Sequence, residues 1–212
     1  MTSSKASDYI LTKTLINNGI KCPKRLWLDF NERKKTDLTS QIYAGNRFGE
    51  KIRNHDTSGL DLSKFKKDEE LLEALNKTRK AINDECKKIY EGVFIFNDTL
   101  VRPDVLKKSK DGWELWEAKI KKINNLEEIE ETHLMDIAIQ YYVLSSCDIN
   151  ITCAKLIYPD GEFIYQEDGN YEGLIKSFDV TKLIQDKCKE VPQYIENFKK
   201  LASPSVDCPD IT

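Results

Sequence analysis

The stretch from Tyr90 to Ile120 constrains the fold more than any other part of the chain. It contains three short runs rich in β-branched and aromatic residues, GVFIF, TLVRPDVLKK and GWELWEAKI, which are separated by turn signals at Asn97-Asp98 and 110–112. Runs of this kind, joined by tight turns, are typical of neighbouring antiparallel strands. The sequence therefore predicts a three-stranded antiparallel meander over these runs.

Helical patterns surround these strands. Apolar residues recur at helical spacing in SDYILTKTLINNG, where Ser7 or Asp8 would cap the helix and Gly19 would end it. Pro23 would open a short second helix in PKRLWLDF. Further helices are expected over 40–54, 67–88, 130–146 and 181–201, and further strands over 151–159, 162–166 and 175–180.

This order of elements predicts an α+β sandwich in which helices cover a mixed sheet. At 212 residues the chain suits a single domain. We expect a helical N-terminal segment over about 1–88 and a core over about 89–201.

Hydropathy and the N-terminal residues bear on location. No apolar run approaches the roughly 18 residues of a membrane-spanning helix, and MTSSKASDYILTKTL lacks the basic start and apolar core of a secretory signal. We therefore expect a cytoplasmic protein without a membrane partner. No GxxxxGK[ST] loop for ATP binding occurs in the sequence.

The net charge of −3 does not by itself predict binding to nucleic acid. Lysine and arginine nevertheless gather in short clusters, and acidic runs such as LEEIEE offset them elsewhere. A basic groove on an acidic body would bind phosphates. The alternative is that these lysines are ordinary solvated surface residues, and charge alone favours this alternative. The clusters lie at 21–25, 64–67, 107–110 and 119–122.

Asp104 in VRPDVL, and Glu117 and Lys119 in WEAKI, are the residues best suited to chemistry. Glu117 and Lys119 are two residues apart, so their side chains point to the same face of a strand. If 110 and 111 form the centre of the hairpin turn, Asp104 lies opposite Glu117. If 111 and 112 form the centre, Asp104 lies opposite Lys119. Either register brings all three side chains to one face, and a shift of one residue would scatter them.

Two carboxylates this close repel each other unless a cation lies between them. Carboxylate oxygens suit Mg²⁺ and Mn²⁺, and such an ion polarises a phosphodiester and lowers the pKa of a bound water. A neighbouring lysine would position that water and offset charge in the transition state. The same residues would also suit a surface hairpin with an ordinary cross-strand ion pair, and the hairpin alone does not decide between the two interpretations.

Two neighbouring segments favour the active-site interpretation. In THLMDIAIQYYVL, His133, Asp136 and Gln140 form a polar stripe along a largely apolar helix, and polar groups there need partners. In AGNRFGEKIRN, Glu50 lies on a predicted helix and would supply a third carboxylate, although alone it would be an ordinary surface glutamate.

Strand alternation also predicts where the tryptophans of GWELWEAKI point. Trp116 and Ala118 share the face opposite Glu117 and would belong to the core. Trp113 has the parity of Glu117 and would share its face.

Taken together, these segments resemble the RecB-like branch of the PD-(D/E)xK nucleases, which includes the CRISPR-associated RecB-like exonucleases and the AddB nuclease domain. The stretches KCPKRLWLDF, GNRFGE, YEGVF, VRPDVL, WEAKI and HLMDIAIQYYVL occur in the same order as in uncharacterised bacterial members, and the likeness covers nearly the whole chain. The resemblance implies a restriction-endonuclease-like core, in which a mixed sheet is flanked by helices. It also implies a nuclease that depends on Mg²⁺ or Mn²⁺.

The resemblance further implies a role for each motif residue. Asp104 and Glu117 would bind the metal, joined by the carbonyl oxygen of Ala118. Lys119 would position or activate the attacking water. Gln140 would orient the lysine or contact the nucleic acid backbone.

The chain departs from the family pattern on the helix that precedes these motifs. Relatives often carry a metal-binding histidine four residues after the helix glycine, but here Gly49 stands four residues after Gly45. We therefore carry the metal-binding role to the adjacent Glu50.

A second departure concerns the helix that carries the polar stripe. The relatives have Gln-x-x-x-Tyr, whereas this chain runs from Gln140 to Leu144. Tyr141 or Tyr142 would have to replace the missing tyrosine.

Six cysteines occur without a CxxC pair, which argues against a zinc ribbon or a thioredoxin-type motif. Related nucleases bind a [4Fe–4S] cluster through one cysteine before the core and three after it, and Cys22 and Cys208 match the first two positions. Such a cluster needs four thiolates, and the last two ligands are absent from this sequence. Two alternatives therefore stay open. Cys22 and Cys208 would be partial or remnant ligands of an iron–sulfur cluster, or Cys22 would be a buried residue and Cys208 a free thiol. The cysteines expected to be small buried hydrophobic residues are those at 86, 147, 153 and 188.

The sequence thus leads to a metal-dependent DNA nuclease as the first hypothesis, with exonuclease-like processing of single strands or duplex ends. A second hypothesis is a module that binds nucleic acid on a nuclease fold without cutting it. A third is a structural or partner subunit that uses its N-terminal helices as an interface. A protein partner in repair, recombination or defence would fit any of them.

Overall fold

The computed structural model describes residues 10–32, 40–121, 123–167, 170–203 and 206–210. These residues form two mixed sheets, one of six strands in the order β2-β3-β6-β7-β8-β9 and one of three strands in the order β1-β5-β4. The larger sheet consists of β2 (Leu60–Asp61), β3 (Lys88–Tyr90), β6 (Val105–Lys108), β7 (Trp113–Ala118), β8 (Ile151–Pro159) and β9 (Ile175–Asp179). The smaller sheet consists of β1 (Leu11–Thr12), β4 (Phe94–Phe96) and β5 (Thr99–Val101).

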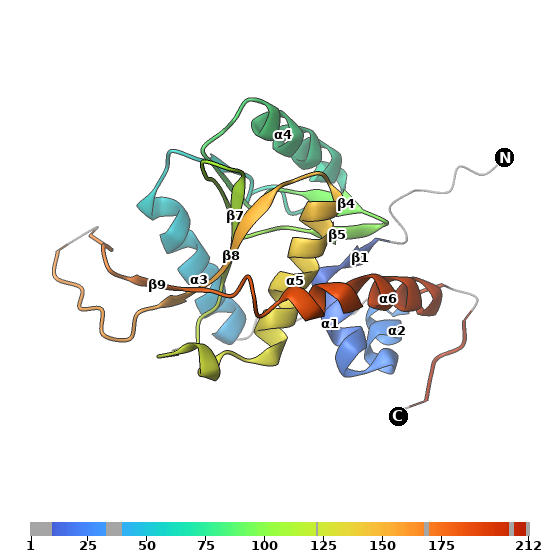
Figure 1. Cartoon of the computed structure of the whole chain (residues 1–212). Coiled ribbons are helices and arrows are strands. Elements are labelled where there is room, and N and C mark those ends of the chain that lie inside the picture. Colours follow the sequence, from blue (N-terminus) through green and yellow to red (C-terminus); the bar gives the residue numbers. More distant parts are fainter. Residues whose placement is uncertain (1–9, 33–39, 122, 168–169, 204–205, 211–212) are drawn as a thin grey trace.

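Helices cover both faces of the larger sheet, with α3 on one side of β7 and β8 and α5 on the other (Figure 1). On the α3 side, Phe48 and Ile52 pack against Tyr90, Val105 and Ile157 of the strands. The larger core lies on the α5 side, and the fold class is therefore α+β, with a mixed sheet flanked by helices, as predicted. The helices are α1 (Lys13–Lys21), α2 (Pro23–Asn31), α3 (Ser40–His55), α4 (Leu71–Asn83), α5 (Glu131–Ser146) and α6 (Gln185–Leu201), with 3₁₀ turns at Asp68–Glu70 and Leu126–Glu128.

The β6–β7 hairpin adopts the first of the two registers considered above. Val105 pairs with Trp116, and the amide of Ser109 donates to the carbonyl oxygen of Gly112 at 2.9 Å, so that 110 and 111 form the centre of the turn. Extending this register by one residue places Asp104 opposite Glu117. The turn is tight at Gly112, where an added Cβ atom would lie only 2.4 Å from the backbone oxygen of Asn150.

The predicted three-stranded meander is wrong, because the chain changes sheets at Arg102-Pro103. β4 and β5 form a hairpin of the smaller sheet, whereas β6 pairs with β3 and β7 in the larger one. Pro103 has no amide hydrogen with which to continue a strand ladder. The guanidinium of Arg102 fixes the crossing by donating to the carbonyl oxygens of Leu62 and Phe65, at 2.9 and 2.5 Å.

Several predicted boundaries also differ from the structure. α1 begins after Thr12, whose hydroxyl accepts a hydrogen bond from the amide of Leu15, while the predicted caps Ser7 and Asp8 lie outside the described residues. Gly19 does not end this helix, but lies inside it where an added Cβ atom would lie 2.9 Å from the ring of Phe198. The helix expected over 67–88 ends at Asn83, and the strand expected over 162–166 is absent from the described residues there.

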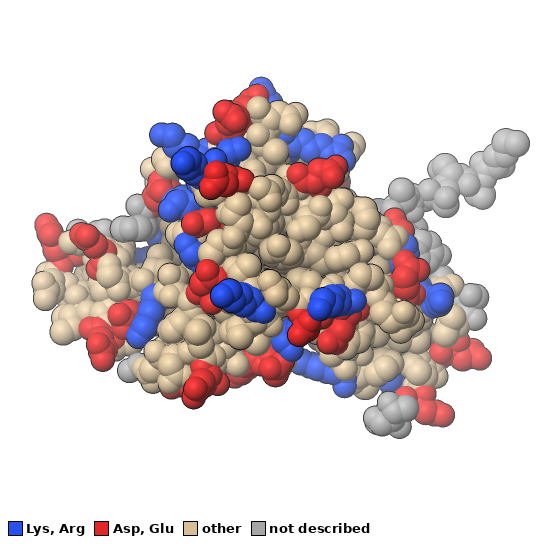
Figure 2. Space-filling model, viewed as in Figure 1, with Lys and Arg blue, Asp and Glu red and all other residues tan. Residues whose placement is uncertain are grey.

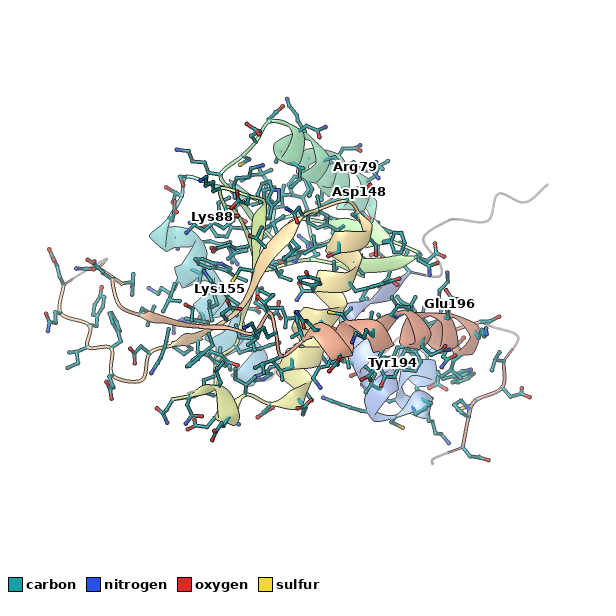
Figure 3. The ribbon with its side chains drawn as sticks, viewed as in Figure 1. Arg79, Lys88, Asp148, Lys155, Tyr194 and Glu196 are labelled. Carbon is teal, nitrogen blue, oxygen red and sulfur yellow. The ribbon has the colours of Figure 1, made fainter. Side chains whose placement is uncertain are left out.

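The two tryptophans of β7 exchange the places expected of them. Trp113 is 4% exposed and belongs to the main core. Trp116 is only partly buried on the α3 side, where the ammonium groups of Lys107 and Lys155 lie 5.2 and 5.5 Å from its ring centroid (Lys155 is labelled in Figure 3). The alternation was right, but the larger core lies on the face that also carries Glu117.

The N-terminal helices are part of the same packed structure, because α1 contacts both α5 and α6 (Figure 1). Charged side chains of both signs are spread around the face shown in Figure 2, with an uncharged area between the positions of α4 and α6. Among the described residues, no helix combines the length and the apolar character needed to cross a bilayer.

Candidate active site

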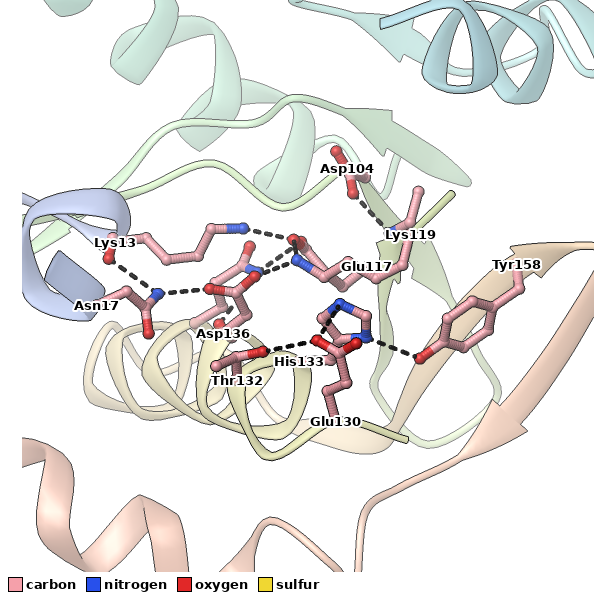
Figure 4. A network of polar contacts seen from close by, with 12 residues as sticks. Lys13, Asn17, Asp104, Glu117, Lys119, Glu130, Thr132, His133, Asp136 and Tyr158 are labelled. Atoms are coloured by element: carbon pink, nitrogen blue, oxygen red, sulfur yellow. Dashed lines mark hydrogen bonds and ion pairs between the residues drawn. The ribbon is translucent and has the colours of Figure 1, made fainter. Parts of the chain in front are cut away.

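Asp104, Glu117 and Lys119 meet where β6 begins and β7 ends. The amide of Ala118 donates to Oδ2 of Asp104 at 2.6 Å, which ties the residue before β6 to the last residue of β7. Glu117 and Lys119 both point toward α5, and Lys119 Nζ lies 3.1 Å from Oε1 of Glu117 (Figure 4). The structure therefore brings together the three residues that the sequence singled out.

Glu117 is 3% exposed, yet both of its carboxylate oxygens have partners. Oε1 accepts from Nζ of Lys13 at 2.5 Å as well as from Lys119, and Oε2 accepts from Nε2 of Gln140 at 2.6 Å. Burial opposes ionisation, but the ammonium groups of Lys13 and Lys119 outweigh it and lower the pKa of Glu117 to about 2. Glu117 is therefore a carboxylate at neutral pH.

The opposing carboxyl group of Asp104 behaves in the reverse sense. Burial, followed by the negative charge of Glu117, raises the pKa of Asp104 well above its ordinary value. The pKa values of the two acids are thus shifted in opposite directions, although the two side chains face each other across one hairpin. This difference shows that the positive groups present compensate Glu117 but leave the negative charge of Asp104 poorly compensated.

Lys119 bridges the hairpin and α5. Its ammonium group pairs with Glu117 and with Asp136, which also accepts a hydrogen bond from the side-chain amide of Asn17. Burial lowers the pKa of Lys119, but Glu117 and Asp136 outweigh burial and raise it overall. Lys119 therefore remains an ammonium group, suited to orienting water and offsetting negative charge rather than to removing a proton.

The polar stripe of α5 faces this cluster, and its members find partners there. Asp136 contacts Lys119, Gln140 contacts Glu117, and Nδ1 of His133 lies 3.3 Å from the hydroxyl of Tyr158 (Figure 4). Burial and the ammonium group of Lys119 lower the pKa of His133, which favours the neutral imidazole. On this helix it is Asp136, and not Gln140, that contacts the lysine.

Gln140 is fully buried, and its amide orientation follows from its neighbour. Nε2 donates to the carboxylate of Glu117, since the opposite orientation would turn the amide oxygen toward a negative charge. Oε1 is left without a hydrogen-bond partner among the described residues. The two tyrosines considered as substitutes lie away from this contact, because Tyr142 packs edge-on against Phe96 and Tyr141 lies beside Cys188 of α6.

The cluster opens into a cleft of about 940 Å³ between α3 and the end of β7. Glu50 lines this cleft as an exposed side chain of α3, and Gly49 beside it also lines the cleft. The lining also carries a set of cations that would face a bound anion. They are Arg47, Arg53, Lys66, Arg102 and Lys119.

Glu91 is a fourth carboxylate of the cleft, beside Glu50, Asp104 and Glu117, and the sequence interpretation did not assign it. It follows β3 with a left-handed backbone (φ 54°), and its carboxylate lies 3.7 Å from Nε of Arg102. Burial raises its pKa, and its charge contributes to the raised pKa of Asp104. The stretch YEGVF contains it, so the resemblance pointed to the segment without giving the residue a role.

Lys13 and Asn17 of α1 were also missed. Lys13 contacts Glu117, and Asn17 contacts Asp136, so the first helix contributes directly to the cluster (Figure 4). Only a loose signal was available, because a lysine and an asparagine four residues apart are common on exposed helix faces.

The donor atoms around Asp104 and Glu117 fit a hard divalent cation. Two opposed carboxylates and the backbone of Ala118 offer the oxygen ligands that Mg²⁺ and Mn²⁺ prefer, and the poorly compensated charge of Asp104 would favour a cation. Among the described residues, no group of three or more His, Cys, Asp or Glu side chains is already arranged to hold a metal ion. Water and the backbone would therefore have to complete the coordination.

The described cysteines do not fit a [4Fe–4S] cluster as they stand. Cys22 lies between α1 and α2, and Cys208 lies in a C-terminal segment that Trp27 holds through a 2.8 Å hydrogen bond to the carbonyl oxygen of Val206. No three cysteines gather within the described part of the chain. The remaining cysteines are all partly buried, and burial raises the pKa of three of their thiols, those of Cys147, Cys153 and Cys188.

Comparisons with known proteins add little to this geometry. No protein-family model matches the sequence, and no curated protein matches it either. A solved structure titled "Crystal structure of SSO0001" aligns with 91% of this chain and 78% of its own, at a TM-score of 0.41 and 11% identity. The fold and the site described above therefore rest on the residues of this chain alone.

Proposed function

We propose that this chain is a metal-dependent nuclease that hydrolyses phosphodiester bonds in DNA, acting as an exonuclease on single strands or duplex ends in the cytoplasm. The observation that carries the proposal is the meeting of Asp104, Glu117 and Lys119 at one end of a cleft lined by basic side chains. A protein partner in repair, recombination or defence would supply the context for such an activity.

Each residue of the cluster has a part that its chemistry suits. Asp104, Glu117 and the carbonyl oxygen of Ala118 would hold Mg²⁺ or Mn²⁺, which when bound lowers the pKa of a water and polarises the phosphate. Lys119 would orient the attacking water and offset developing negative charge. Asp136 holds Lys119 in place, and Gln140 holds the carboxylate of Glu117.

The cations of the cleft would bind the DNA backbone. Arg47, Arg53 and Lys66 line the cleft around the cluster and are suited to phosphate contacts. Affinity that depends on such contacts falls steeply as salt rises, because binding releases counterions from the DNA and that release becomes less favourable at higher salt concentration.

The test is cleavage of end-labelled single- and double-stranded DNA with Mn²⁺ or Mg²⁺ by the native protein and by Asp104→Asn and Lys119→Met. We expect each substitution to lower the rate by about 10²–10⁴-fold, because each removes a group placed at the reacting phosphate. A ladder that shortens from one end would identify an exonuclease, whereas internal products would identify an endonuclease.

Lys155→Met is the matched control, because Lys155 pairs with Glu114 on the α3 face, away from the cluster. It should cleave DNA at the native rate. Cleavage that persists in Asp104→Asn and Lys119→Met would refute the assignment of these residues.

The second candidate function is a module that binds nucleic acid without cutting it. The observation that favours it is that both oxygens of Glu117 already contact protein groups, Lys13 and Gln140. Binding of DNA by the native protein at low salt, without cleavage under either metal, would support this candidate. Absence of DNA binding at low salt would instead favour a structural or partner subunit.

A further inference from the structure

Lys13 reaches the cluster from a distant part of the chain. It is 104 residues before Glu117, yet its Nζ lies 2.5 Å from Oε1 of that residue. Lys119 Nζ lies 3.1 Å from the same oxygen. One carboxylate oxygen of a nearly inaccessible glutamate therefore contacts two ammonium groups.

The local structure of α1 does not account for this lysine. Lys13 is the first residue of the helix, directly after the cap Thr12, and a cation at a helix N-terminus is disfavoured by the helix dipole. The carboxylates of the cluster must therefore provide the attraction that holds its side chain. Asn17 keeps this turn against the site, since its side-chain amide donates to the carbonyl oxygen of Lys13 at 3.1 Å and also to Asp136.

A divalent cation bound between Asp104 and Glu117 would need an oxygen of Glu117 that another group now occupies. Oε2 accepts from Gln140, which is fully buried on α5. Oε1 contacts Lys119, which Asp136 also holds, and Lys13, whose side chain is 23% exposed. Of these three partners, Lys13 has the most exposed side chain.

We propose that Lys13 is an internal counter-cation that occupies Oε1 of Glu117 in the metal-free protein and leaves it when a divalent cation binds. Metal binding is then an exchange of one cation for another at Glu117, and the Lys13–Glu117 pair opposes it. This inference rests on the metal site of the proposed function, but not on the cleavage of DNA.

The first test is calorimetric titration of Mn²⁺ into the chelator-treated native protein and into Lys13→Met, which keeps the length of the side chain without its charge. Mn²⁺ should bind Lys13→Met about tenfold more tightly, which corresponds to about 1.4 kcal/mol. Lys21→Met, at the other end of α1, is the matched control and should bind Mn²⁺ as the native protein does. Unchanged or weaker binding by Lys13→Met would overturn the exchange.

A second measurement uses the native protein, so it does not depend on the folding of a variant. Acetylation of lysines by an amine-reactive ester is followed by mass spectrometry in chelator and in saturating Mn²⁺. Lys13 should react several-fold faster with Mn²⁺ present, because its ammonium group has left Glu117, while Lys21 should react equally in both. An unchanged Lys13 rate would contradict the proposal.

Glu117→Gln separates the two proposals. It should abolish Mn²⁺ binding in the native and the Lys13→Met backgrounds, and binding that survives it overturns the exchange. A native protein that exchanges Lys13 for Mn²⁺ but cuts no DNA would refute the nuclease while supporting the exchange. A protein that cuts DNA without any change in the reactivity of Lys13 on addition of Mn²⁺ would support the nuclease and refute the exchange.

Discussion

Replacement of Asp104 by asparagine should slow cleavage as stated above and, in the absence of metal, make the protein more stable at neutral pH. The pKa of Asp104 is raised in the folded protein by burial and by Glu117. A carboxyl group with a raised pKa contributes stability below its unfolded pKa of about 3.9, and that contribution is lost as pH rises through the folded pKa. Asparagine does not titrate, and its Oδ1 can still accept the hydrogen bond from the amide of Ala118.

The magnitude of this effect follows from the single proton involved. The stability of the native protein relative to Asp104→Asn falls by at most about 1.36 kcal/mol for each pH unit, so the difference can grow by at most about 2.7 kcal/mol between pH 5 and pH 7. Glu117, with a pKa of about 2, stays ionised across this window and contributes no slope of its own. We expect the difference to be smallest at pH 5 and to favour the variant increasingly at pH 6 and pH 7.

Urea denaturation followed by circular dichroism, at the three pH values and with a chelator, measures these free energies of unfolding. A variant less stable than the native protein at pH 7, or a difference independent of pH, would refute the reasoning about Asp104. Saturating Mn²⁺ should reverse the order, because the native protein gains about 2.7 kcal/mol at 100 times its Kd while the variant loses a ligand.

Two further predictions concern the turn of the hairpin and the thiols. Gly112→Ala should lower the free energy of unfolding by about 1–3 kcal/mol, because the new Cβ atom would lie only 2.4 Å from the backbone oxygen of Asn150. A variant that melts at the same temperature as the native protein would contradict this prediction. Burial raises the pKa of Cys188 to about 11, so about one thiol in a thousand is a thiolate at pH 8. Iodoacetamide should therefore label the exposed Cys208 well before Cys188, and equal rates would show that Cys188 is more open than the structure indicates.

The parts of the site that the sequence predicted are those that depend on local periodicity. Glu117 and Lys119 share a face because strand side chains alternate, and Asp136 and Gln140 share a face because they are one helical turn apart. The register of Asp104 against Glu117 was left open, because it depends on which two residues form the centre of the turn. The packing of Gly112 against Asn150, far along the chain, accompanies the observed choice.

The parts that the sequence did not predict depend on contacts between distant segments. The short run TLVRPDVLKK was interpreted as one strand, but it divides between two sheets because Arg102 is held by carbonyl oxygens of Leu62 and Phe65. Lys13 acquires its partner only when α1 packs beside α5. The periodicity of residues within one segment cannot predict contacts between segments that are far apart in the sequence.

The dependence of the cluster on α1 has a consequence for the order in which the protein folds. Lys13 precedes Glu117 by 104 residues, and Asn17 precedes Asp136 by 119, so the cluster closes some of the longest loops in the chain. Contacts of such long sequence separation form late, because the entropy of loop closure must be overcome before they add stability. A chain still emerging from the ribosome can bring Asp104 and Glu117 together across the hairpin, but Asp136 and Gln140 can join them only after α5 has been synthesised. The complete cluster is therefore among the later features of the fold to form.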